Sequence, residues 1–505
     1  MRCFKLRLPA LLLALTLLLS GCTLFERTAS EPAAAQTPPQ EAEHEITLRT
    51  DRIETLFTVG WSPSQGMNPF TDRSAVNSVI LPLLYEGLFR LTPDFEAEPV
   101  LCEAAESSAD GMTWRFTLKK GIRFSNNTIL TSADVVYSLE LARQSELYGT
   151  RLAAIQSIET GGLYQVMIKL SESMGSLPLL LDVPIIRSNT LEAPIGTGPY
   201  TLVRTQTEDY LEHTENWHGG ETPIGRIYLY EVSDMDSVRD AFEFGHVDMV
   251  VSDLNAVGAV NFHSNYELWS QDTTILQFLS FNEDSPIFSS ASVRAAVTHA
   301  IDRQSIITEL FDGYGVAAVL PAHPRSSCYD LSLAARFGYE EMKLNDAAIN
   351  AGVYGRRGTL LVNADNASNV AAAQSIADSL RSEGLEISVL AAAGRNYTEL
   401  LEKGGYDLAY CEVRLTPDFD LSAFFGGSLS QYAIANVDAP TLCTAALENS
   451  GNFYDLHKLI MEQGLMCPIL FKSRAVMTDR GAVSGLNAAP DNVFYGLSDL
   501  SINRN

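Results

Sequence analysis

The 505-residue sequence has few basic side chains, and this shortage excludes several functions. It contains 35 Lys or Arg against 62 Asp or Glu, a formal net charge of −27. Proteins that hold nucleic acid or anionic lipid by charge need a dense basic surface, and no cluster of Lys and Arg is visible in the sequence. We therefore expect no nucleic-acid partner and no electrostatic attachment to a membrane.

The sequence also lacks the motifs of common enzymes. It has no GxSxG, HExxH or Walker A pattern, so we expect no catalytic residues, no metal site and no cofactor. His213 and His218 are close in the sequence, but both lie among polar residues, and we expect them on the surface. Gly196-Thr197-Gly198-Pro199-Tyr200 lacks the Lys-Ser/Thr of a phosphate loop, and Pro199 has no N–H to donate. A structural turn is predicted there.

Cysteine is sparse and follows no recognisable pattern. After Cys3 and Cys22 there are five more, without CxxC spacing: Cys102, Cys328, Cys411, Cys443 and Cys467. An odd number without regular spacing defines no disulfide framework. We expect buried thiols, and one or two disulfide bonds remain an alternative.

The first residues predict a location outside the cytoplasm. Three basic residues precede the apolar run 8–19, which is shorter than the roughly 20 residues that span a bilayer. Leu19-Ser20-Gly21-Cys22 follows and resembles the lipobox of bacterial lipoproteins. The resemblance implies that residues 1–21 are a lipoprotein signal peptide and that the Cys22 thiol receives a lipid. An ordinary cleaved signal peptide with an incidental cysteine is the alternative.

The segment after Cys22 is predicted to be a tether. Removal of residues 1–21 takes away three basic and no acidic side chains, which changes the formal charge from −27 to −30. Residues 22–45 are rich in Ala, Pro, Glu, Gln and Thr without apolar periodicity, so we predict that they are disordered. No later segment has 18 uncharged apolar residues in succession, and we expect the remainder to be soluble.

Residues 359–413 show the clearest alternation of strand and helix patterns. Strands are predicted at 359–363, 385–390 and 406–413, with helices at 369–382 and 397–403 between them. This βαβαβ order predicts a parallel or mixed sheet covered by helices, and therefore an α/β fold.

Local signals predict further elements. Alternation predicts a strand at 114–118, and Thr131-Ser132-Ala133-Asp134 resembles a capping box that begins a helix. A strand at 227–232, a helix at 238–244 and a strand at 247–251 follow. Ser289 or Ser290 is expected to cap a helix that ends before Gly313 and has these residues on its apolar face: Val293, Val297, Ala300 and Ile301.

Several short segments stand in order along the chain and carry a recognisable pattern. They are Met67-Asn68-Pro69-Phe70, Leu84-Tyr85-Glu86-Gly87-Leu88, 114–125, 131–138, 196–200, 242–248, Val293-Arg294-Ala295-Ala296-Val297-Thr298-His299-Ala300-Ile301-Asp302-Arg303 and a late Cys467-Pro468-Ile469-Leu470 strand. In register, from about residue 46 to 500, these segments resemble the family 5 extracytoplasmic solute-binding proteins, the peptide, oligopeptide and nickel class of ABC-importer receptors.

The resemblance implies a two-lobed periplasmic-binding-protein-like α/β fold of the class II, cluster C type, with an extra domain in the first lobe. Lobe 1 (domain I) would comprise residues 46–82, 196–275 and 471–505. The extra domain (domain II) would comprise residues 83–195, and lobe 2 (domain III) residues 276–470. Crossing strands would form a hinge, and ligand would be enclosed between the lobes.

The segment 411–420 departs from the family pattern. Peptide-binding members tend to have W-x-A-D-Y-x-D-P here, in which the first Asp pairs with the peptide ammonium. This sequence has Leu415 near that position and no Trp. Glu412, Asp418 or Asp420 could supply a substitute carboxylate, and Arg414 would suit a ligand carboxylate. Solvated loop charges are the alternative for each.

Two further places are implied to face the ligand. In the family the loop after Asn68-Pro69 approaches the ligand from lobe 1. This resemblance suggests four ligand-binding residues: Phe70, Thr71, Asp72 and Arg73. Asn282 follows a crossing strand at 276–280 and could bond an extended ligand or merely cap the turn. Trp61 and Trp217 are expected to serve packing.

The two resemblances, to the lipobox and to the solute-binding family, therefore imply a monomeric, lipid-anchored receptor that captures peptides or oligopeptides and delivers them to ABC permease and ATPase subunits. A receptor of the same fold for a nickel chelate, haem or oligosaccharide is the alternative. An extracytoplasmic hydrolase would need a nucleophile–base pair in the cleft, and a signalling receptor would need an attached signalling domain. Neither feature is visible in the sequence.

Overall fold

The computed structural model describes residues 57–254 and 265–503. The predicted signal peptide, Cys22 and the predicted tether lie outside the described residues. Within the described ranges, no helix combines the length and apolar character needed to cross a membrane.

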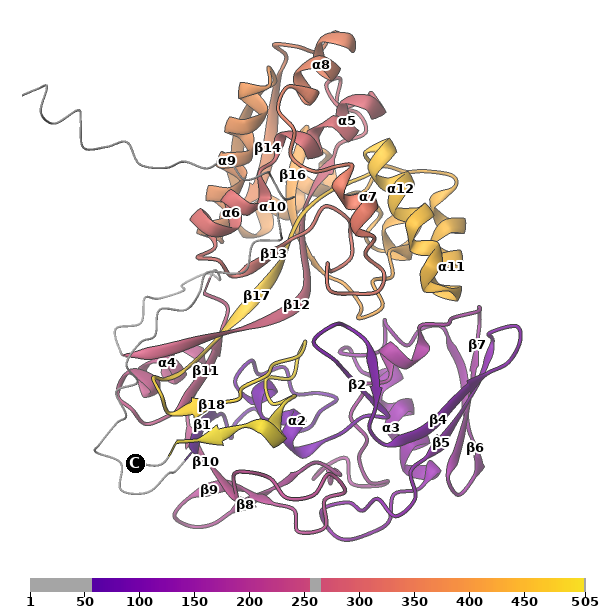
Figure 1. Cartoon of the computed structure of the whole chain (residues 1–505), viewed down its shortest axis with the longest axis vertical. Helices are drawn as coiled ribbons and strands as arrows, with labels where there is room; N and C mark the ends of the chain where they lie inside the picture. Colours follow the sequence, from indigo (N-terminus) through magenta and orange to yellow (C-terminus); the bar gives the residue numbers. More distant parts are fainter. Residues whose placement is uncertain (1–56, 255–264, 504–505) are drawn as a thin grey trace, which may run out of the picture. The chain divides into compact units, whose positions relative to one another are not determined.

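A long mixed sheet organises the fold (Figure 1). Its strand order is β15-β14-β16-β12-β17-β11-β1-β10-β9-β8, and β13 pairs with β17. The strands are β1 (Phe57–Trp61), β8 (Tyr200–Arg204), β9 (Asp209–His213), β10 (Arg226–Glu231), β11 (Met249–Ser252), β12 (Tyr266–Phe281), β13 (Gly315–Ala317), β14 (Arg357–Asn363), β15 (Glu386–Ala392), β16 (Leu408–Arg414) and β17 (Cys467–Asp479).

Two antiparallel strands, β12 and β17, belong to both halves of this sheet. Their first pairing joins residues 266–272 to 473–479, next to β11, and their second joins residues 276–279 to 467–471, next to β16. The register shifts between Asp272 and Leu276. We call the half with β1 and β8–β11 lobe 1 and the half with β13–β16 lobe 2.

In lobe 1, β1 runs parallel to β10 and β11. Helix α4 (Met235–Glu243) begins at Asp234, whose carboxylate accepts from the Ser237 N–H at 2.8 Å, and packs Val238 and Phe242 inward. The remaining elements are η1 (Asn77–Val79), α2 (Leu81–Leu84), β18 (Val483–Ser484), η7 (Leu497–Asp499) and β19 (Ser501–Ile502).

The predicted turn at 196–200 is structural. It packs on the end of α2, where the Gly198 N–H donates to the Leu84 carbonyl at 3.1 Å. A Cβ on Gly196 would lie 2.0 Å from the carbonyl oxygen of Leu84, so the backbone approach requires glycine.

The segment between α2 and β8 carries a separate small sheet, ordered β4-β5-β7-β6. Helix α3 begins as predicted, because Asp134 accepts from the N–H and the hydroxyl of Thr131 at 2.9 and 2.8 Å. The elements are β2 (Phe89–Leu91), β3 (Ala97–Pro99), β4 (Cys102–Ser107), β5 (Thr113–Leu118), α3 (Ser132–Gln144), β6 (Ile155–Gly162), β7 (Gln165–Leu170) and η2 (Leu177–Leu180).

The βαβαβ prediction for lobe 2 is confirmed. Strand β14 pairs in parallel with both β15 and β16, and α9 and α10 pack against these strands (Figure 1). The helices are α5 (Ala291–Val297), η3 (Thr298–Ala300), α6 (Arg303–Leu310), α7 (Leu331–Ala335), α8 (Lys343–Asn350), α9 (Ala367–Ser382), α10 (Gly394–Lys403), η4 (Ser422–Phe425), η5 (Ser430–Tyr432), α11 (Ala439–Glu448), η6 (Ser450–Asn452) and α12 (Phe453–Gln463).

The prediction of a single helix that is capped at Ser289 or Ser290 and ends before Gly313 is wrong. Helix α5 ends at Val297, and α6 begins anew at Asp302, whose carboxylate accepts from the Ser305 N–H at 3.1 Å. The N-cap carboxylate replaces a continuing helical bond, which divides the apolar pattern between two helices.

The cysteines pack in the interior. Within the described residues, Cys102, Cys328, Cys411, Cys443 and Cys467 are buried free thiols. Burial raises the pKa of Cys102 to about 11 and that of Cys411 to about 12. These thiols are therefore protonated and unreactive at neutral pH.

Candidate ligand-binding site

A cavity of about 1120 Å³ is lined by both lobes and by the segment between α2 and β8. This exceeds the roughly 300–1,000 Å³ of typical small-ligand sites. Lobe 2 contributes the end of β16 and the loop after it, from Arg414 to Pro417. The cavity therefore has room for a ligand larger than a single small metabolite.

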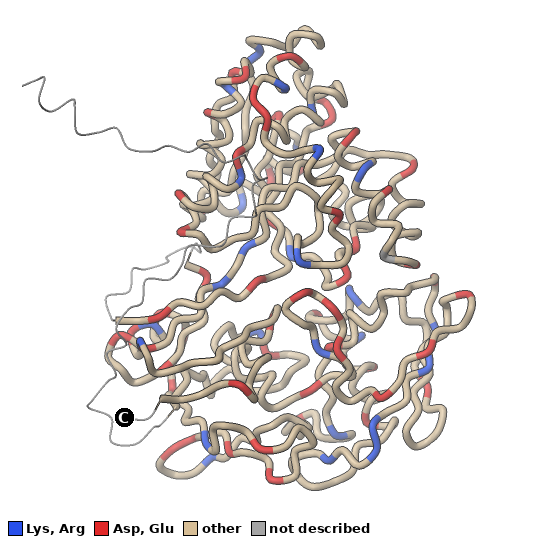
Figure 2. The backbone as a smooth tube through the Cα atoms, viewed as in Figure 1, with Lys and Arg blue, Asp and Glu red and all other residues tan. Residues whose placement is uncertain are grey.

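The lining is rich in charge of both signs. It includes six basic and six acidic residues: Arg73, Arg90, Lys119, Arg151, Arg414 and Arg474, with Asp72, Glu86, Glu98, Glu146, Asp182 and Asp491. Elsewhere acidic and basic residues are spread along the described backbone (Figure 2). In a chain of 35 basic and 62 acidic residues, an even balance marks the cavity as relatively cationic.

Asp72 and Arg73 reach the cavity because Asn68 folds their loop. Its side-chain oxygen accepts from the Phe70 N–H at 2.9 Å, and its carbonyl accepts from the Asp72 N–H at 2.9 Å. Arg73 forms an ion pair with Glu146, and both side chains are exposed. Burial raises the pKa of Asp72, opposed by a hydrogen bond from the Ser74 N–H.

Phe70 and Thr71 do not line the cavity. Phe70 is buried and packs edge-on against Tyr148, with ring centroids 6.3 Å apart. Thr71 is exposed outside the cavity lining. Of the four residues predicted in this loop, the structure brings Asp72 and Arg73 to the cavity.

Arg414 reaches the cavity from the end of β16, where its Nη1 lies 3.3 Å from Oδ1 of Asp491 in lobe 1. Leu415 follows and also lines the cavity. Peptide-binding members are expected to carry an ammonium-binding Asp near this position. In this chain the position is therefore apolar.

The other predicted residues of lobe 2 lie elsewhere. Glu412 accepts from Gln277 Nε2 at 2.7 Å and lies 3.5 Å from Lys472 Nζ. Asp418 is 1% exposed and accepts from the Ser176 hydroxyl at 2.9 Å. Burial raises its pKa. Neither carboxylate lines the cavity.

The prediction that Asn282 enters the cleft does not agree with its position. Its side-chain N–H groups donate to the carbonyls of Gly404 and Tyr406 at 3.0 and 2.6 Å. The register pairs Ile275 with Arg414, so Asn282 lies roughly 20 Å away along β12. These contacts agree with the alternative prediction, in which Asn282 caps the turn.

The cavity residues that the sequence did not predict include Arg151, Asp182, Arg474 and Asp491. Arg151 forms an ion pair with Asp182, whose pKa burial raises. Two signals were available. Asp182 is a single charge directly after three leucines, and Arg474 stands in an otherwise largely apolar strand.

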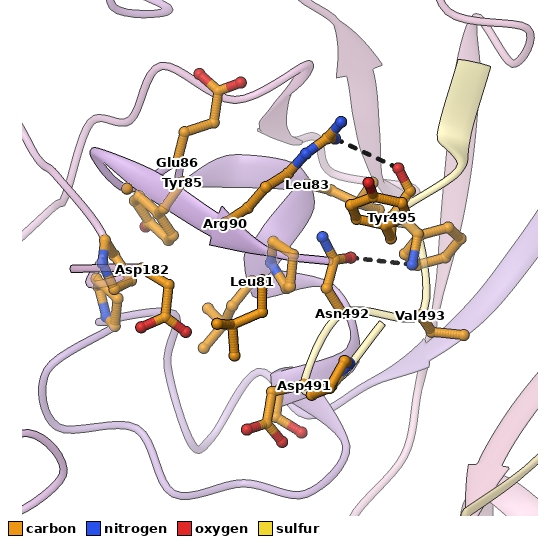
Figure 3. A pocket seen from close by; sticks show the side chains of 18 of the residues that line it. Leu81, Leu83, Tyr85, Glu86, Arg90, Asp182, Asp491, Asn492, Val493 and Tyr495 are labelled. Atoms are coloured by element: carbon orange, nitrogen blue, oxygen red, sulfur yellow. Dashed lines mark hydrogen bonds between the residues drawn. The ribbon is translucent and has the colours of Figure 1, made fainter. Parts of the chain in front are cut away.

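The remaining wall of the cavity is held by polar contacts. Arg90 stacks over Tyr495, 4.4 Å from its ring centroid, and donates to its carbonyl at 3.4 Å (Figure 3). Asn492 accepts from the Phe494 N–H at 3.0 Å (Figure 3). Trp217, which was expected to serve packing, lines the cavity and donates to Glu86 at 3.0 Å.

The expected surface histidines have ordinary partners. His213 Nδ1 lies 3.1 Å from the Thr222 hydroxyl, and His218 Nε2 lies 2.9 Å from Glu86. Trp61 is buried in the core. Over the described ranges, no group of three or more His, Cys, Asp or Glu side chains is arranged to hold a metal ion.

The architecture defines a two-lobed α/β fold. It is similar to the solved structure of the oligopeptide-binding protein AppA from Bacillus subtilis in complex with a nonapeptide. The TM-score is 0.60 at 20% identity, over 89% of this chain and 99% of that chain. NikZ from Campylobacter jejuni, in complex with Ni(L-His), gives 0.63 at 17% identity, over 88% and 99%. These similarities establish the fold, and the predicted two-lobed α/β class is confirmed.

Sequence comparison identifies the family. The model of the bacterial extracellular solute-binding proteins, family 5, matches residues 96–432, and the chain belongs to this family. AppA of Bacillus subtilis is 23% identical over 366 residues, which are 68% of this chain and 65% of AppA. The match thus spans slightly less than two thirds of this relative. Family members are extracytoplasmic substrate-binding proteins of ABC transporters and not enzymes.

Proposed function

We propose that this protein is a lipid-anchored receptor of an ABC importer that captures peptides or oligopeptides between its lobes and delivers them to a permease. The observation that carries this proposal is the cavity of about 1120 Å³ with six basic and six acidic lining residues. A peptide presents opposite charges at its ends and many backbone groups between them, which such a lining can pair. AppA, which is named as an oligopeptide-binding protein, supports the same class of ligand.

Asp72, Arg73 and Arg414 are the predicted site residues that we propose as ligand contacts. Asp72 and Arg73 approach from lobe 1 and Arg414 from lobe 2, so a ligand between them would contact both lobes. Closure of the lobes around it would exclude water from these contacts and strengthen them.

Peptides are expected to stabilise the protein against heat. Ligand that binds only the native state raises the free energy of unfolding by RT ln(1 + [L]/Kd), or about 2.7 kcal/mol at 100 times Kd. A thermal-shift screen of the protein without residues 1–21 against di- to hexapeptides should therefore raise the midpoint for some of them. Native mass spectrometry of the purified protein would weigh any ligand that co-purifies.

The same screen tests the alternatives. Nickel–histidine chelate, haem and oligosaccharides serve as the competing ligands, since NikZ was solved with Ni(L-His). A shift with one of these and none with any peptide would contradict the peptide proposal and leave the family assignment intact.

Replacing Cys22 by serine is expected to release the protein from membranes. Each buried methylene of an acyl chain contributes about 0.8 kcal/mol, so two or three chains on Cys22 would hold it durably. Fractionation of cells that express the wild type and Cys22→Ser checks this, with Cys102→Ser as the control that keeps the lipobox. Undiminished membrane association of Cys22→Ser would rule out the lipid anchor.

A further inference from the structure

Three arginines from separate parts of the chain line the cavity together with Asp491. Arg414 ends β16, Arg474 lies in β17, and Arg151 lies between α3 and β6. Nη1 of Arg414 lies 3.3 and 3.5 Å from the two carboxylate oxygens of Asp491. Although partial desolvation by the cavity walls opposes it, the positive charges of Arg414, Arg474 and Arg151 lower the pKa of Asp491, which is therefore ionised at neutral pH.

This cluster retains positive charge after its internal pairs are counted. Arg151 is paired with Asp182, and Arg414 with Asp491. Within the described part of the chain, Arg474 has no carboxylate within 4.0 Å, although it lines the cavity. An ammonium group brought to Asp491 would meet neighbouring guanidinium groups, whereas a carboxylate would be attracted by them.

The contact between Arg414 and Asp491 is easily exchanged. Their side chains are 43% and 57% exposed, and exposed ion pairs contribute little to stability. A ligand carboxylate could take a two-point contact with a guanidinium, which the 3.3–3.5 Å pair with one nitrogen does not provide. Asp491 also has a φ of 57°, so its turn holds it in a conformation that few residues other than glycine adopt.

We propose that Asp491 occupies the place of a ligand carboxylate on Arg414, and that a ligand with a free carboxylate displaces it and is held by Arg414 and Arg474. The proposal rests on the proposed function and names the ligand class more closely: solutes with a free carboxylate group, held at that group by the two arginines. Asp491 acts as a competitor within the chain, because it neutralises Arg414 until the ligand arrives. Its side chain then lowers affinity instead of contributing to it.

The first test uses tri- to hexa-alanine, each with a free and an amidated carboxyl end. These probes carry no side-chain charge, so the two forms differ only at the carboxylate. Calorimetric titration of the wild type is expected to show at least tenfold tighter binding of the free acids. Equal binding of both forms would overturn this inference but not the proposed function, whereas binding of neither form would contradict both.

The second test uses variants with the free-acid probe. Asp491→Asn is expected to bind it about two- to fivefold more tightly, the range set by the loss of an exposed ion pair. Arg474→Gln is expected to bind it at least tenfold more weakly and to leave the amide unchanged. Weaker binding by Asp491→Asn would show that Asp491 holds the ligand ammonium and would overturn the proposal.

Matched controls separate the site from overall charge. Asp236→Asn removes a 79% exposed carboxylate paired with Arg239 on α4. Arg395→Gln removes a 92% exposed guanidinium on α10. Both lie outside the cavity lining, and both are expected to bind the free acids as the wild type does. A gain in Asp236→Asn equal to that in Asp491→Asn would overturn the role of Asp491 as a competitor.

Discussion

Replacing Arg303 by methionine is expected to lower the free energy of unfolding of lobe 2 by about 3 kcal/mol or more. The side chain is 5% exposed and lies at the start of α6. Its guanidinium donates to the carbonyls of Pro468 at 2.8 Å, Ala318 at 3.0 Å and Thr298 at 3.1 Å. Methionine would fill much of the volume but would leave these buried acceptors without donors.

The arginine joins two nearby segments to a third that is 165 residues away in sequence. Ala318 follows β13, Pro468 is the second residue of β17, and Thr298 lies in η3. Lysine would keep the charge but cannot supply the forked set of N–H donors, so Arg303→Lys should rescue only part of the loss. Full rescue by lysine would show that charge alone matters.

Denaturant unfolding and hydrogen exchange of residues 298–318 measure this effect. The control is Arg395→Met, because Arg395 is 92% exposed and its pair with Glu399 lies on the surface. An unchanged midpoint and unchanged exchange in Arg303→Met would refute the structural role assigned to the buried guanidinium.

The α/β pattern of lobe 2 could be predicted because its signals are local. Residues 357–414 alternate in segments of strand and helix length, and glycines such as Gly384, with a φ of 93°, end the helices. The break at Ile301 and Asp302 could not be seen in the apolar pattern. From the sequence alone, an arginine that follows an aspartate is expected on the surface. Only tertiary packing makes Arg303 a buried hydrogen-bond donor.

The cavity was predictable only in part, for a related reason. The resemblance pointed to Asp72, Arg73 and Arg414, which the structure brings to one cavity. Asp491 and Arg151 are more than 300 residues apart, yet both line the same cavity. No spacing in the sequence indicates that these two residues share a cavity. Local rules also could not tell that the Asp418 carboxylate is buried, whereas that of Asp491 faces a cavity.

Replacing Phe95 by alanine is expected to loosen the contact between the 83–195 region and lobe 2. Phe95 lies in the turn between β2 and β3, yet it is 2% exposed and packs within the core cluster of lobe 2. Its ring centroid lies 4.4 Å from that of His323 and 5.3 Å from that of Phe419. Truncation of a buried phenylalanine typically costs about 3–5 kcal/mol.

Polar contacts also support the same junction, in addition to the hydrogen bond from Ser176 to Asp418, and the exposed ones should be weaker than the ring. Arg325 lies 3.0 Å from Asp94, and both side chains are largely exposed. The Gly175 N–H donates to the Leu447 carbonyl at 2.8 Å. Arg325→Ala is therefore expected to lower the free energy of unfolding by no more than about 1 kcal/mol. It serves as a milder variant at the same junction, for comparison with Phe95→Ala.

The measurement is hydrogen exchange of residues 319–326 and 415–425, which surround the ring, together with ligand affinity. Phe95→Ala should accelerate exchange there, and Phe244→Ala, which truncates a 78% exposed ring on lobe 1, should not. Leu91 of β2 and Leu415 of lobe 2 both line the cavity, so the Phe95 junction links two of its walls. If ligand binding requires both walls in place, affinity falls with the fraction of molecules that keep the junction. Unchanged exchange and affinity in Phe95→Ala would mean that the ring only fills space, and that the two walls of the cavity are held together by other contacts.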